Sequence, residues 1–413
     1  MSHPDPASPQ SREGGVAADV GRIVVVGGGP AAHRGALELR KLGFNGSITM
    51  VSSESVPPYD RTLLSKDNLC DADAAIANLA AAGTYEELGI DLRLGREAIT
   101  LDAAARTVGL ADGTGLDYDR LILAVGGAPV LPRALAAPGV LTMRRFSDVA
   151  PMRDALERGR HIAVIGAGFI GGEIASAAAG SGCGVTLIEA GDVPLEPVLG
   201  RTVGALVGDL HKTHGVDLRC GTQADRVVDL GGGYQVDLSD GTQVSCDSVI
   251  VGVGMRPSIA WLRDSGIRTD RAILTDSLCR TSLPDVFAAG DCAQWWSNRY
   301  GRHVHIEHWD TAARHGAAAA RCALGMGSPF DPIPFFWSDQ YDVKYQWAGY
   351  APEWDRVDIS GDGPEEFTAR YLLADRLVGV LVANRPKEFA QLRRGLLSDA
   401  QEPSPTDKEV ISQ

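Results

Sequence analysis

Two glycine-rich turns constrain the fold of this chain more than any other feature. The first, at 27–29, directly follows the apolar run 23–26, and the second, at 166–168, follows the apolar run 162–165. A glycine turn between a strand and a helix lets the backbone approach a pyrophosphate and points the helix N-terminus at it. The chain is therefore predicted to hold two dinucleotides, and a protein that holds two usually moves electrons between them.

The sequence around each turn repeats a strand–helix–strand pattern. A second repeat supports the first, because Val108–Pro129 and Val236–Pro257 align without a gap at an offset of 128 residues. Each of these segments contains an Asp-Gly hairpin signal, and chance similarity of two hairpins is the alternative explanation. We interpret the chain as two copies of one nucleotide-binding unit. The predicted elements are strand 22–26, helix 30–42 and strand 47–52 in the first copy, and strand 161–165, helix 168–180 and strand 184–189 in the second.

Beyond Pro329 the composition changes, because tryptophan, tyrosine and phenylalanine gather between 335 and 354 and an apolar strand follows at 377–382. We predict an α/β fold with two Rossmann-like nucleotide-binding domains and a C-terminal α+β domain. The predicted divisions are a disordered leader at 1–20, a discontinuous first domain at 21–145 and 262–328, a second domain at 146–261, a third domain at 329–397 and a tail at 398–413.

Composition narrows the class of protein. The formal net charge of −14 argues against nucleic acid or an anionic membrane as a general partner. No apolar run approaches the roughly 20 residues of a membrane helix, and the N-terminal segment lacks the pattern of a secretory signal. The seven cysteines form no closely spaced pair, which fits a reducing compartment. We therefore expect a cytoplasmic protein.

The second turn carries the stronger cofactor signal. Gly166-x-Gly168-x-x-Gly171 follows a strand, and Glu189 ends the next strand. An acidic residue at that place accepts hydrogen bonds from a ribose 2′-OH and repels a 2′-phosphate, so the sequence favours NADH over NADPH. A purely structural glycine turn is the alternative.

The first turn is less regular. Its third position is Ala32, which still permits close packing, but His33 follows where a small residue is expected. Glu54 or Ser53 lies near the end of the next strand and is predicted to reach an adenosine ribose. For Glu54 the alternative is a solvated acid on a loop.

Four further segments complete a family pattern: YDRTLLSK at 59–66, TSLPDVFAAGDCA at 281–293, EHW at 307–309 and FWSDQYD at 336–342. Together with the turns they resemble the pyridine-nucleotide flavoproteins, in the branch of the putidaredoxin, rubredoxin and Rieske-dioxygenase ferredoxin reductases. The apoptosis-inducing-factor flavoproteins are more distant relatives. The resemblance covers 22–385 and implies FAD on the first copy, NADH on the second, the domain arrangement of glutathione reductase, and a monomer or homodimer.

The resemblance also implies roles for charged residues. The Gly290-Asp291 corner would bind FAD through a cofactor hydroxyl, with a helix N-cap as the alternative role of Asp291. Arg61 would lie near the FAD phosphates and Lys66 beside the flavin ring, where a cation favours the reduced flavin. Glu173 would face the flavin and pair with Lys66. Surface charges on a loop are the alternative for Arg61 and Lys66.

Three aromatic residues are expected around the flavin. Phe169 would be a gate on the nicotinamide side, Trp309 would pack beside the flavin, and Trp337 with 338–340 would close the pocket; core packing is the alternative for each. Lys66, Glu173 and Trp309 are the predicted catalytic residues. The remaining predicted cofactor-binding positions are Gly27, Gly29, Pro30, Ala31, Ala32, Glu54, Ala124, Gly126, Gly166, Gly168, Ile170, Gly171, Glu189, Gly254, Glu307 and His308.

The chain departs from the family pattern at four positions. Thr62 and Leu63 stand where the family usually has two prolines, and Thr311 and His315 stand where it commonly has Asn and Gln. These positions lie at or near the flavin and the acceptor side. They leave FAD binding expected and bear on the identity of the electron acceptor.

Two other kinds of site are alternatives to the flavin pattern. His303, His305, His308 and His315 lie close in sequence, but the flavin motif accounts for the segment, so no metal site is predicted. The first helix lacks the redox cysteine pair of glutathione-reductase relatives, so no dithiol relay is predicted.

The combined prediction is an NADH-dependent FAD flavoprotein reductase. A hydride would pass from NADH to FAD, and single electrons would then pass to a small [2Fe–2S] ferredoxin of an oxygenase system. One alternative is a stand-alone flavoenzyme that reduces oxygen or a small molecule near Trp309, Thr311 and His315. Another is a binding protein that senses NADH, like the apoptosis-inducing-factor relatives.

Overall fold

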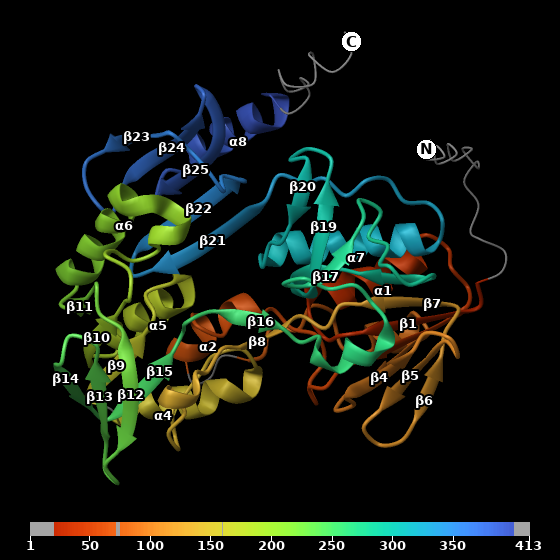
Figure 1. Ribbon diagram of the computed structural model, residues 1–413, viewed down its shortest axis with the longest axis horizontal. Helices are drawn as coiled ribbons and strands as arrows, with labels where there is room; N and C mark the ends of the chain where they lie inside the picture. Colours follow the sequence, from red (N-terminus) through yellow and green to blue (C-terminus); the bar gives the residue numbers. More distant parts are fainter. Residues whose placement is uncertain (1–19, 72–74, 159, 400–413) are drawn as a thin grey trace, which may run out of the picture.

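The computed structural model describes residues 20–71, 75–158 and 160–399. The predicted leader, except for its last residue, and most of the predicted tail lie outside these ranges. In Figure 1 the segments of the first copy (red and orange) lie on the right, those of the second copy (yellow and green) on the left, and the C-terminal sheet (blue) above the second copy.

The first sheet is parallel and has the order β18-β7-β1-β2-β3. Its strands are rich in Val, Ile and Leu and are buried on both faces, as parallel strands require. Two helices, α1 and α7, cover one face, and the hairpin sheet β4-β5-β6 covers the other. The bounds are β1 (Arg22–Val26), β2 (Ser47–Val51), β3 (Ile90–Arg93), β4 (Ala98–Asp102), β5 (Thr107–Leu110), β6 (Gly115–Asp117), β7 (Arg120–Leu123), β18 (Val286–Ala288), α1 (Pro30–Lys41) and α7 (Trp309–Ala323).

The second sheet repeats this layout with the order β11-β10-β9-β15. Helices α4 and α5 cover one face, and the antiparallel sheet β12-β13-β14 covers the other. The bounds are β9 (His161–Ile165), β10 (Gly184–Ile188), β11 (Asp217–Arg219), β12 (Ala224–Asp229), β13 (Tyr234–Leu238), β14 (Gln243–Cys246), β15 (Ser248–Val251), α4 (Val149–Arg158), α5 (Phe169–Gly180) and α6 (Glu196–Thr213).

The hairpin repeat predicted from the sequence is present and joins the two copies. In each copy the hairpin leads into a sheet strand and then into a short strand, β8 (Gly127–Pro129) or β16 (Met255–Pro257). These two short strands pair antiparallel, with Pro129 opposite Met255. After this junction β18 returns the chain to the first sheet, so the first sheet is built from two separate stretches of sequence.

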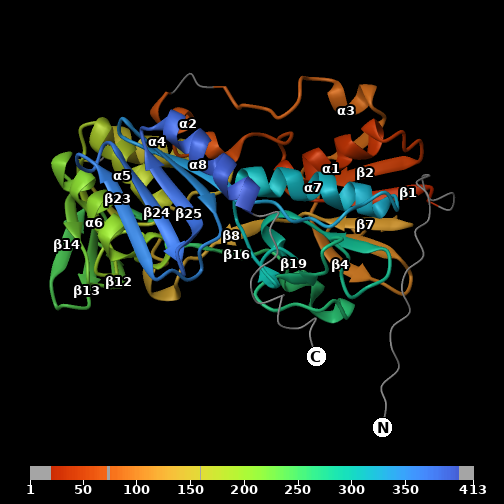
Figure 2. The same cartoon turned by 90° about the horizontal axis from the view of Figure 1, so that it is seen from above.

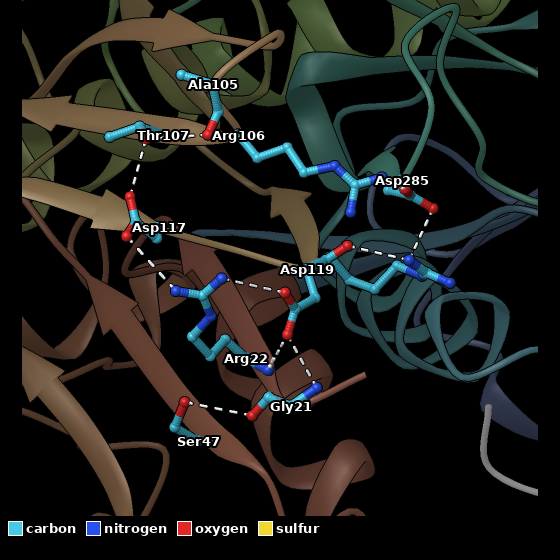
Figure 3. Close-up of polar contacts among 10 residues, drawn as sticks. Gly21, Arg22, Ser47, Ala105, Arg106, Thr107, Asp117, Asp119 and Asp285 are labelled. Carbon is cyan, nitrogen blue, oxygen red and sulfur yellow. Dashed lines mark hydrogen bonds and ion pairs between the residues drawn. The ribbon is translucent and has the colours of Figure 1, made fainter. Parts of the chain in front are cut away.

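Polar contacts fasten the first sheet at the start of β1 and at the start of the returning strand β18 (Figure 3). The backbone N–H of Arg22 donates to the carboxylate of Asp119 over 2.8 Å at the start of β1. Arg120 Nη1 lies 2.8 Å from Asp285 Oδ1, and Arg106 also pairs with Asp285. Because Asp285 directly precedes β18, these contacts fasten β18 to β7.

The C-terminal region is an antiparallel sheet of order β21-β22-β25-β24-β23 with one covering helix, α8. One face packs on α6 and the other on α8, which confirms the predicted α+β composition. The bounds are β21 (Phe335–Gln340), β22 (Val343–Gly349), β23 (Arg356–Gly361), β24 (Phe367–Leu373), β25 (Arg376–Ala383) and α8 (Pro386–Asp399).

Short elements connect these layers. Figure 2 shows α1 and α7 lying side by side across the first sheet, an arrangement that matters for the site below. Within the described ranges, no helix is both long and apolar enough to cross a membrane. The remaining elements are β17 (Ile273–Thr275), β19 (Ala293–Ser297), β20 (Arg302–Val304), α2 (Asp67–Cys70), α3 (Thr84–Glu87) and the 3-10 turns Arg61–Leu63, Arg133–Leu135, Phe146–Asp148, Ala260–Ser265 and Gly290–Cys292.

Candidate active site

The first glycine turn combines a tight contact with an open space. A Cβ on Gly27 would lie 2.0 Å from the backbone oxygen of Ala124, and the φ angle of +145° also requires glycine. At Gly29 the nearest atom to a Cβ would be Arg61 Nε, 3.9 Å away. The backbone at Gly29, which precedes α1, therefore faces space that a ligand can occupy.

A cavity of about 590 Å³ runs along this turn. It is lined by residues that include 26–31, Arg61, Arg144, Gly290 and Asp291. Its size lies within the range of cofactor sites, about 300–1,000 Å³. The open backbone at Gly29, the nearby helix N-terminus and the basic side chains suit a pyrophosphate, so the residues fit FAD.

Glu54 and Arg61 line this cavity and contact each other. Arg61 Nη2 lies 2.5 Å from Glu54 Oε1, and the Tyr59 hydroxyl donates to Glu54 Oε2 over 2.8 Å. Burial raises the pKa of Tyr59, so its hydroxyl keeps its proton. Glu54 is thus an oriented carboxylate with both oxygens engaged, which argues against a solvated acid on a loop.

Asp291 is held at the Gly290 corner by a residue that the sequence did not single out. Arg144 Nη2 lies 2.7 Å from Asp291 Oδ2, and His305 Nε2 lies 2.8 Å from the Asp291 backbone oxygen. Burial raises the pKa of the nearby Glu307, and the Asp291 charge adds to that shift. The corner is therefore an ionic cluster rather than a lone N-cap.

Buried polar atoms without a partner gather at the start of α7. They are His308 Nδ1, Trp309 Nε1 and Thr311 Oγ1, none of which has a hydrogen-bond partner within the described residues. Burial lowers the pKa of His308 to about 4, so its ring is neutral. Buried polar groups without partners are rare in native proteins. We infer that some of these atoms meet a ligand, which is a second indication that the residues fit a polar cofactor.

His315, a departure from the family pattern, supports the Gly290 corner. The Gly290 N–H donates to His315 Nδ1 over 3.2 Å, and the ring stacks on Phe330 with the centroids 4.3 Å apart. Burial lowers the pKa of His315 to about 3. The neutral imidazole therefore accepts a bond at the position where an amide side chain is common in the family.

Lys66 and Glu173 form an ion pair although they come from different copies. Lys66 Nζ lies 3.2 Å from Glu173 Oε1 and 3.5 Å from Asp339 Oδ2. Ser65 Oγ donates to Glu173 Oε2 over 2.5 Å, and Ser338 Oγ donates to Glu173 Oε1 over 2.7 Å. The Glu173 side chain is only 4% exposed, so these donors supply the stabilisation that a buried carboxylate needs.

The second glycine turn has the same two properties as the first. A Cβ on Gly166 would lie 2.5 Å from the backbone oxygen of Gly252, and a Cβ on Gly171 would lie 1.9 Å from the Gly166 oxygen. At Gly168 no atom lies within 4 Å of a Cβ. The space that a dinucleotide would need is again open at the residue that precedes the helix.

Glu189 is fixed against this second turn. Its Oε2 accepts from the Ala167 N–H over 2.8 Å, and its Oε1 accepts from the Gly191 N–H over 2.8 Å. Two bonds to backbone hold the carboxylate at the end of β10. Each oxygen keeps a further lone pair for a ribose hydroxyl.

The predicted aromatic residues lie where α5, α7 and β21 meet. Phe169 packs edge-on against Phe336 with the centroids 4.6 Å apart, and His308 contacts the same Phe336 at 4.5 Å. Trp309 and Trp337 also meet edge-on, at 6.3 Å. Phe169 therefore packs against the C-terminal sheet, and the two indoles line the junction between α7 and that sheet.

The other predicted positions fall into three groups. Pro30 is the first residue of α1, where its fixed φ suits the helix start. Gly126 and Gly254 have φ angles of +63° and +101°, so both need glycine. Ala31 and Ala32 are buried in the core, whereas Ile170 is 45% exposed. No group of three or more potential ligand side chains comes together as a metal site in the described part of the chain.

Comparison with known protein families shows which family this chain belongs to. The family described as pyridine nucleotide-disulphide oxidoreductase matches residues 21–316, and a reductase C-terminal family matches residues 335–409. The chain belongs to the pyridine nucleotide-disulphide oxidoreductase family. Its matched region contains both glycine turns, Lys66 and Glu173.

Individual members of this family cover nearly the whole chain. The ferredoxin reductase subunit of 5,5′-dehydrodivanillate O-demethylase from Sphingobium sp. is 36% identical over 383 residues, which is 90% of this chain and 92% of that protein. Putidaredoxin reductase from Pseudomonas putida is 34% identical and covers 90% of each chain. The reductase in the crystal structure of the covalent putidaredoxin reductase–putidaredoxin complex superposes with a TM-score of 0.86 at 32% identity, covering 91% of this chain and 93% of that one. The likeness therefore extends through the C-terminal sheet.

Three contacts of the site were missed by sequence reasoning. Arg144 comes from a loop with no motif, and only the fold brings it to Asp291. Ser65 sits next to Lys66 in the recognised segment, but its bond to Glu173 depends on α5. Ser338 was singled out for pocket closure rather than for contact with Glu173. Its alternation with Phe336 and Gln340 on β21 is a signal that could have placed it on one face.

Proposed function

We propose that this protein is an NADH-dependent FAD flavoprotein that reduces a small [2Fe–2S] ferredoxin. The observation that carries the proposal is the pairing of Lys66 from the first copy with Glu173 from the helix of the second, 3.2 Å apart, between two turns that each leave space for a dinucleotide. Curated relatives named as ferredoxin–NAD(+) reductase components of dioxygenase systems support the choice of acceptor.

FAD would be held by the 27–32 turn, the Glu54–Arg61 pair, the Gly290-Asp291 corner and the start of α7. When bound, FAD supplies the chemistry by taking a hydride from NADH and releasing electrons singly. The protein supplies position and charge. Arg61 and the α7 N-terminus offset negative charge, and the neutral His308 and Trp309 ring limit the access of water.

NADH would lie on the second turn, with Gly168 facing its pyrophosphate and Glu189 its adenosine ribose. The Glu189 carboxylate accepts ribose hydroxyls and repels a 2′-phosphate, so we propose NADH rather than NADPH. Lys66 places its ammonium group at the proposed meeting point of the two cofactors. Glu173 and Asp339 orient that group.

Electrons would leave through a groove between α1 and α7. This groove has a volume of about 750 Å³, shares Pro30 with the proposed FAD cavity and includes Trp309 in its lining. Arg314 and Arg321 on its walls are paired with Asp310 and Glu38. Arg34 is exposed and has no ionic partner within the described residues, so it remains available to an acidic protein.

The test uses the full chain reconstituted with FAD. Under anaerobic conditions NADH should bleach the flavin rapidly, and cytochrome c should be reduced only when a [2Fe–2S] ferredoxin is added. Arg34→Glu should lower kcat/KM for ferredoxin about tenfold at low salt and less at high salt, without slowing reduction by NADH. Arg263→Glu, an exposed arginine on the 3-10 turn 260–265, is the matched control.

Two outcomes contradict the proposal. Rapid bleaching followed by reoxidation in air, with no dependence on ferredoxin, points to a stand-alone flavoenzyme. A long-lived complex with NADH that turns over slowly points to an NADH-sensing protein.

The predicted domain divisions and compartment belong to the same proposal. The first domain would comprise 21–145 and 262–328, which is supported by the return of β18 to the first sheet. The second would comprise 146–261 and the third 329–397. A cytoplasmic location is supported by the seven cysteines, all of which are free thiols.

A further inference from the structure

The contact between α5 and β21 combines an aromatic contact with polar ones. Phe169, Gly172, Glu173 and Ser176 lie on one face of α5 at helical spacing. Each contacts the stretch 336–341: Phe169 packs on a ring, Glu173 accepts a hydroxyl, and Ser176 Oγ accepts the Tyr341 N–H over 2.5 Å. The C-terminal sheet thus meets the helix of the proposed NADH site along its whole first half.

Glycine at 172 permits this close approach. A Cβ on Gly172 would lie 2.8 Å from the amide atoms of Gln340, so a larger side chain would have to displace the Gln340 amide from its present position. Gln340 Nε2 in turn lies 3.4 Å from Ser338 Oγ. Both side chains are fully buried. Ser338 therefore has a fixed position beside Glu173.

Adjacent residues of β21 contact the two members of the Lys66–Glu173 pair. Ser338 donates to Glu173 Oε1, the same oxygen that lies 3.2 Å from Lys66 Nζ. Asp339 contacts Lys66 at 3.5 Å and Lys344 at 3.4 Å. With Ser65 on Oε2, the Glu173 carboxylate has a donor on each oxygen besides the ammonium. Donors on a buried carboxylate stabilise its charged form and fix its direction.

We propose that Ser338 is a positioning residue for the redox centre, through which the C-terminal sheet sets the charge that Lys66 and Glu173 present to the flavin. This inference rests on the proposed function, because it requires a flavin beside Lys66. The hydroxyl dipole directs its positive end at Glu173 and offsets part of the negative charge. Without this hydroxyl, the Glu173 carboxylate interacts more strongly with Lys66. The electrostatic potential at the flavin becomes more negative, and reduction of the flavin becomes harder.

The test is a double-mutant cycle on the FAD-loaded full chain, read as the flavin midpoint potential. Ser338→Ala should lower the equilibrium constant for reduction about threefold, which is about 14 mV for a two-electron couple. Glu173→Gln should raise the potential, because it removes a negative charge. When Ser338→Ala is combined with Glu173→Gln, it should change the midpoint potential by less than a third of the change that it causes alone. The reason is that the Glu173 carboxylate, through which Ser338 acts, is absent.

A matched control comes from the same sheet. Thr368 on β24 is also fully buried, and its Oγ1 has no hydrogen-bond partner in the described residues, so Thr368→Val removes a buried hydroxyl that does not touch Glu173. It should leave the potential unchanged. If Ser338→Ala proves unstable, Ser65→Ala serves in its place. It removes the donor to the other Glu173 oxygen, Oε2, and should also lower the midpoint potential.

The outcomes separate the two proposals. An unchanged potential in Ser338→Ala and Ser65→Ala, while Glu173→Gln shifts it, overturns the positioning role alone. Equal effects of Ser338→Ala with and without Glu173→Gln also overturn it, because the hydroxyl would then act independently of Glu173. Failure of the wild-type protein to bind FAD or to be reduced by NADH would instead overturn the proposed function.

Discussion

The helices α1 and α5 follow the two glycine turns in the same way, but different elements cover them. α1 packs on α7 through small residues, and a Cβ on Gly316 would lie 1.9 Å from the Ala31 oxygen. α5 packs on β21 through Glu173 and Ser338. One local unit therefore appears twice, and its tertiary neighbour decides which chemical groups the helix presents.

The two contacts also differ in charge. Burial lowers the pKa of His33 and His308 to about 4 and that of His315 to about 3, so the buried histidines of α1, of α7 and of the α7 N-cap are neutral. The contact between α5 and β21 instead carries Lys66, Glu173 and Asp339. The buried part of the α1–α7 contact is close-packed and holds neutral rings, while its ion pairs Arg314–Asp310 and Arg321–Glu38 lie in the lining of the groove. The buried part of the α5–β21 contact carries charge instead.

The strongest test of the α1 side compares Gly27→Ala with Gly29→Ala. At Gly27 a Cβ would meet the Ala124 oxygen at 2.0 Å and the φ angle is +145°, so we expect a loss of about 2–4 kcal/mol in unfolding free energy. FAD should then fail to copurify. Urea unfolding and flavin content measure the two effects.

Gly29→Ala separates ligand contact from folding. Its Cβ would enter open space, with the nearest atom 3.9 Å away, so unfolding should change little while FAD binding weakens. Equal destabilisation by both variants would contradict the view that the space over Gly29 is reserved for a ligand.

Sequence reasoning succeeds for the features that both copies share. The glycine turns, the strands and the Asp-Gly hairpins are local, so composition and spacing alone predict them. The covering elements are not local. Nothing near Asp291 in sequence points to Arg144, and Ser338 reaches Glu173 only because β21 lies on α5. Such contacts depend on how distant segments pack, which periodicity does not encode.

Acid should lower the stability of the α1–α7 contact through His315 on α7. Its folded pKa, about 3, lies below the ordinary value of 6.5, so folding favours the neutral ring. That stabilisation is complete above pH 6.5 and is lost as the pH falls toward 3, by at most about 1.4 kcal/mol per pH unit. His315→Gln keeps an acceptor for the Gly290 N–H and should flatten the decline in unfolding free energy between pH 7.5 and 5.

The matched variant is His303→Gln, which changes a partly exposed ring on β20. It controls for the loss of a histidine ring outside the buried contact. If His315→Gln retains the full decline, the acid sensitivity of this side arises from other groups, and the neutral support assigned to His315 is wrong.

The smallest expected effect compares the two acids that end the second strands, Glu189 and Glu54. Among the described residues, the Glu189 carboxylate is held by backbone N–H groups of 167 and 191, whereas that of Glu54 is held by the side chains of Arg61 and Tyr59. Glu189→Gln removes the charge but keeps one acceptor, so KM for NADH should rise about tenfold at most, with kcat nearly unchanged and weaker discrimination against NADPH. Glu54→Gln should weaken FAD retention and leave KM for NADH unaltered. An exchange of these two outcomes, measured by steady-state kinetics and flavin content, would mean that the two copies hold their cofactors in the opposite order.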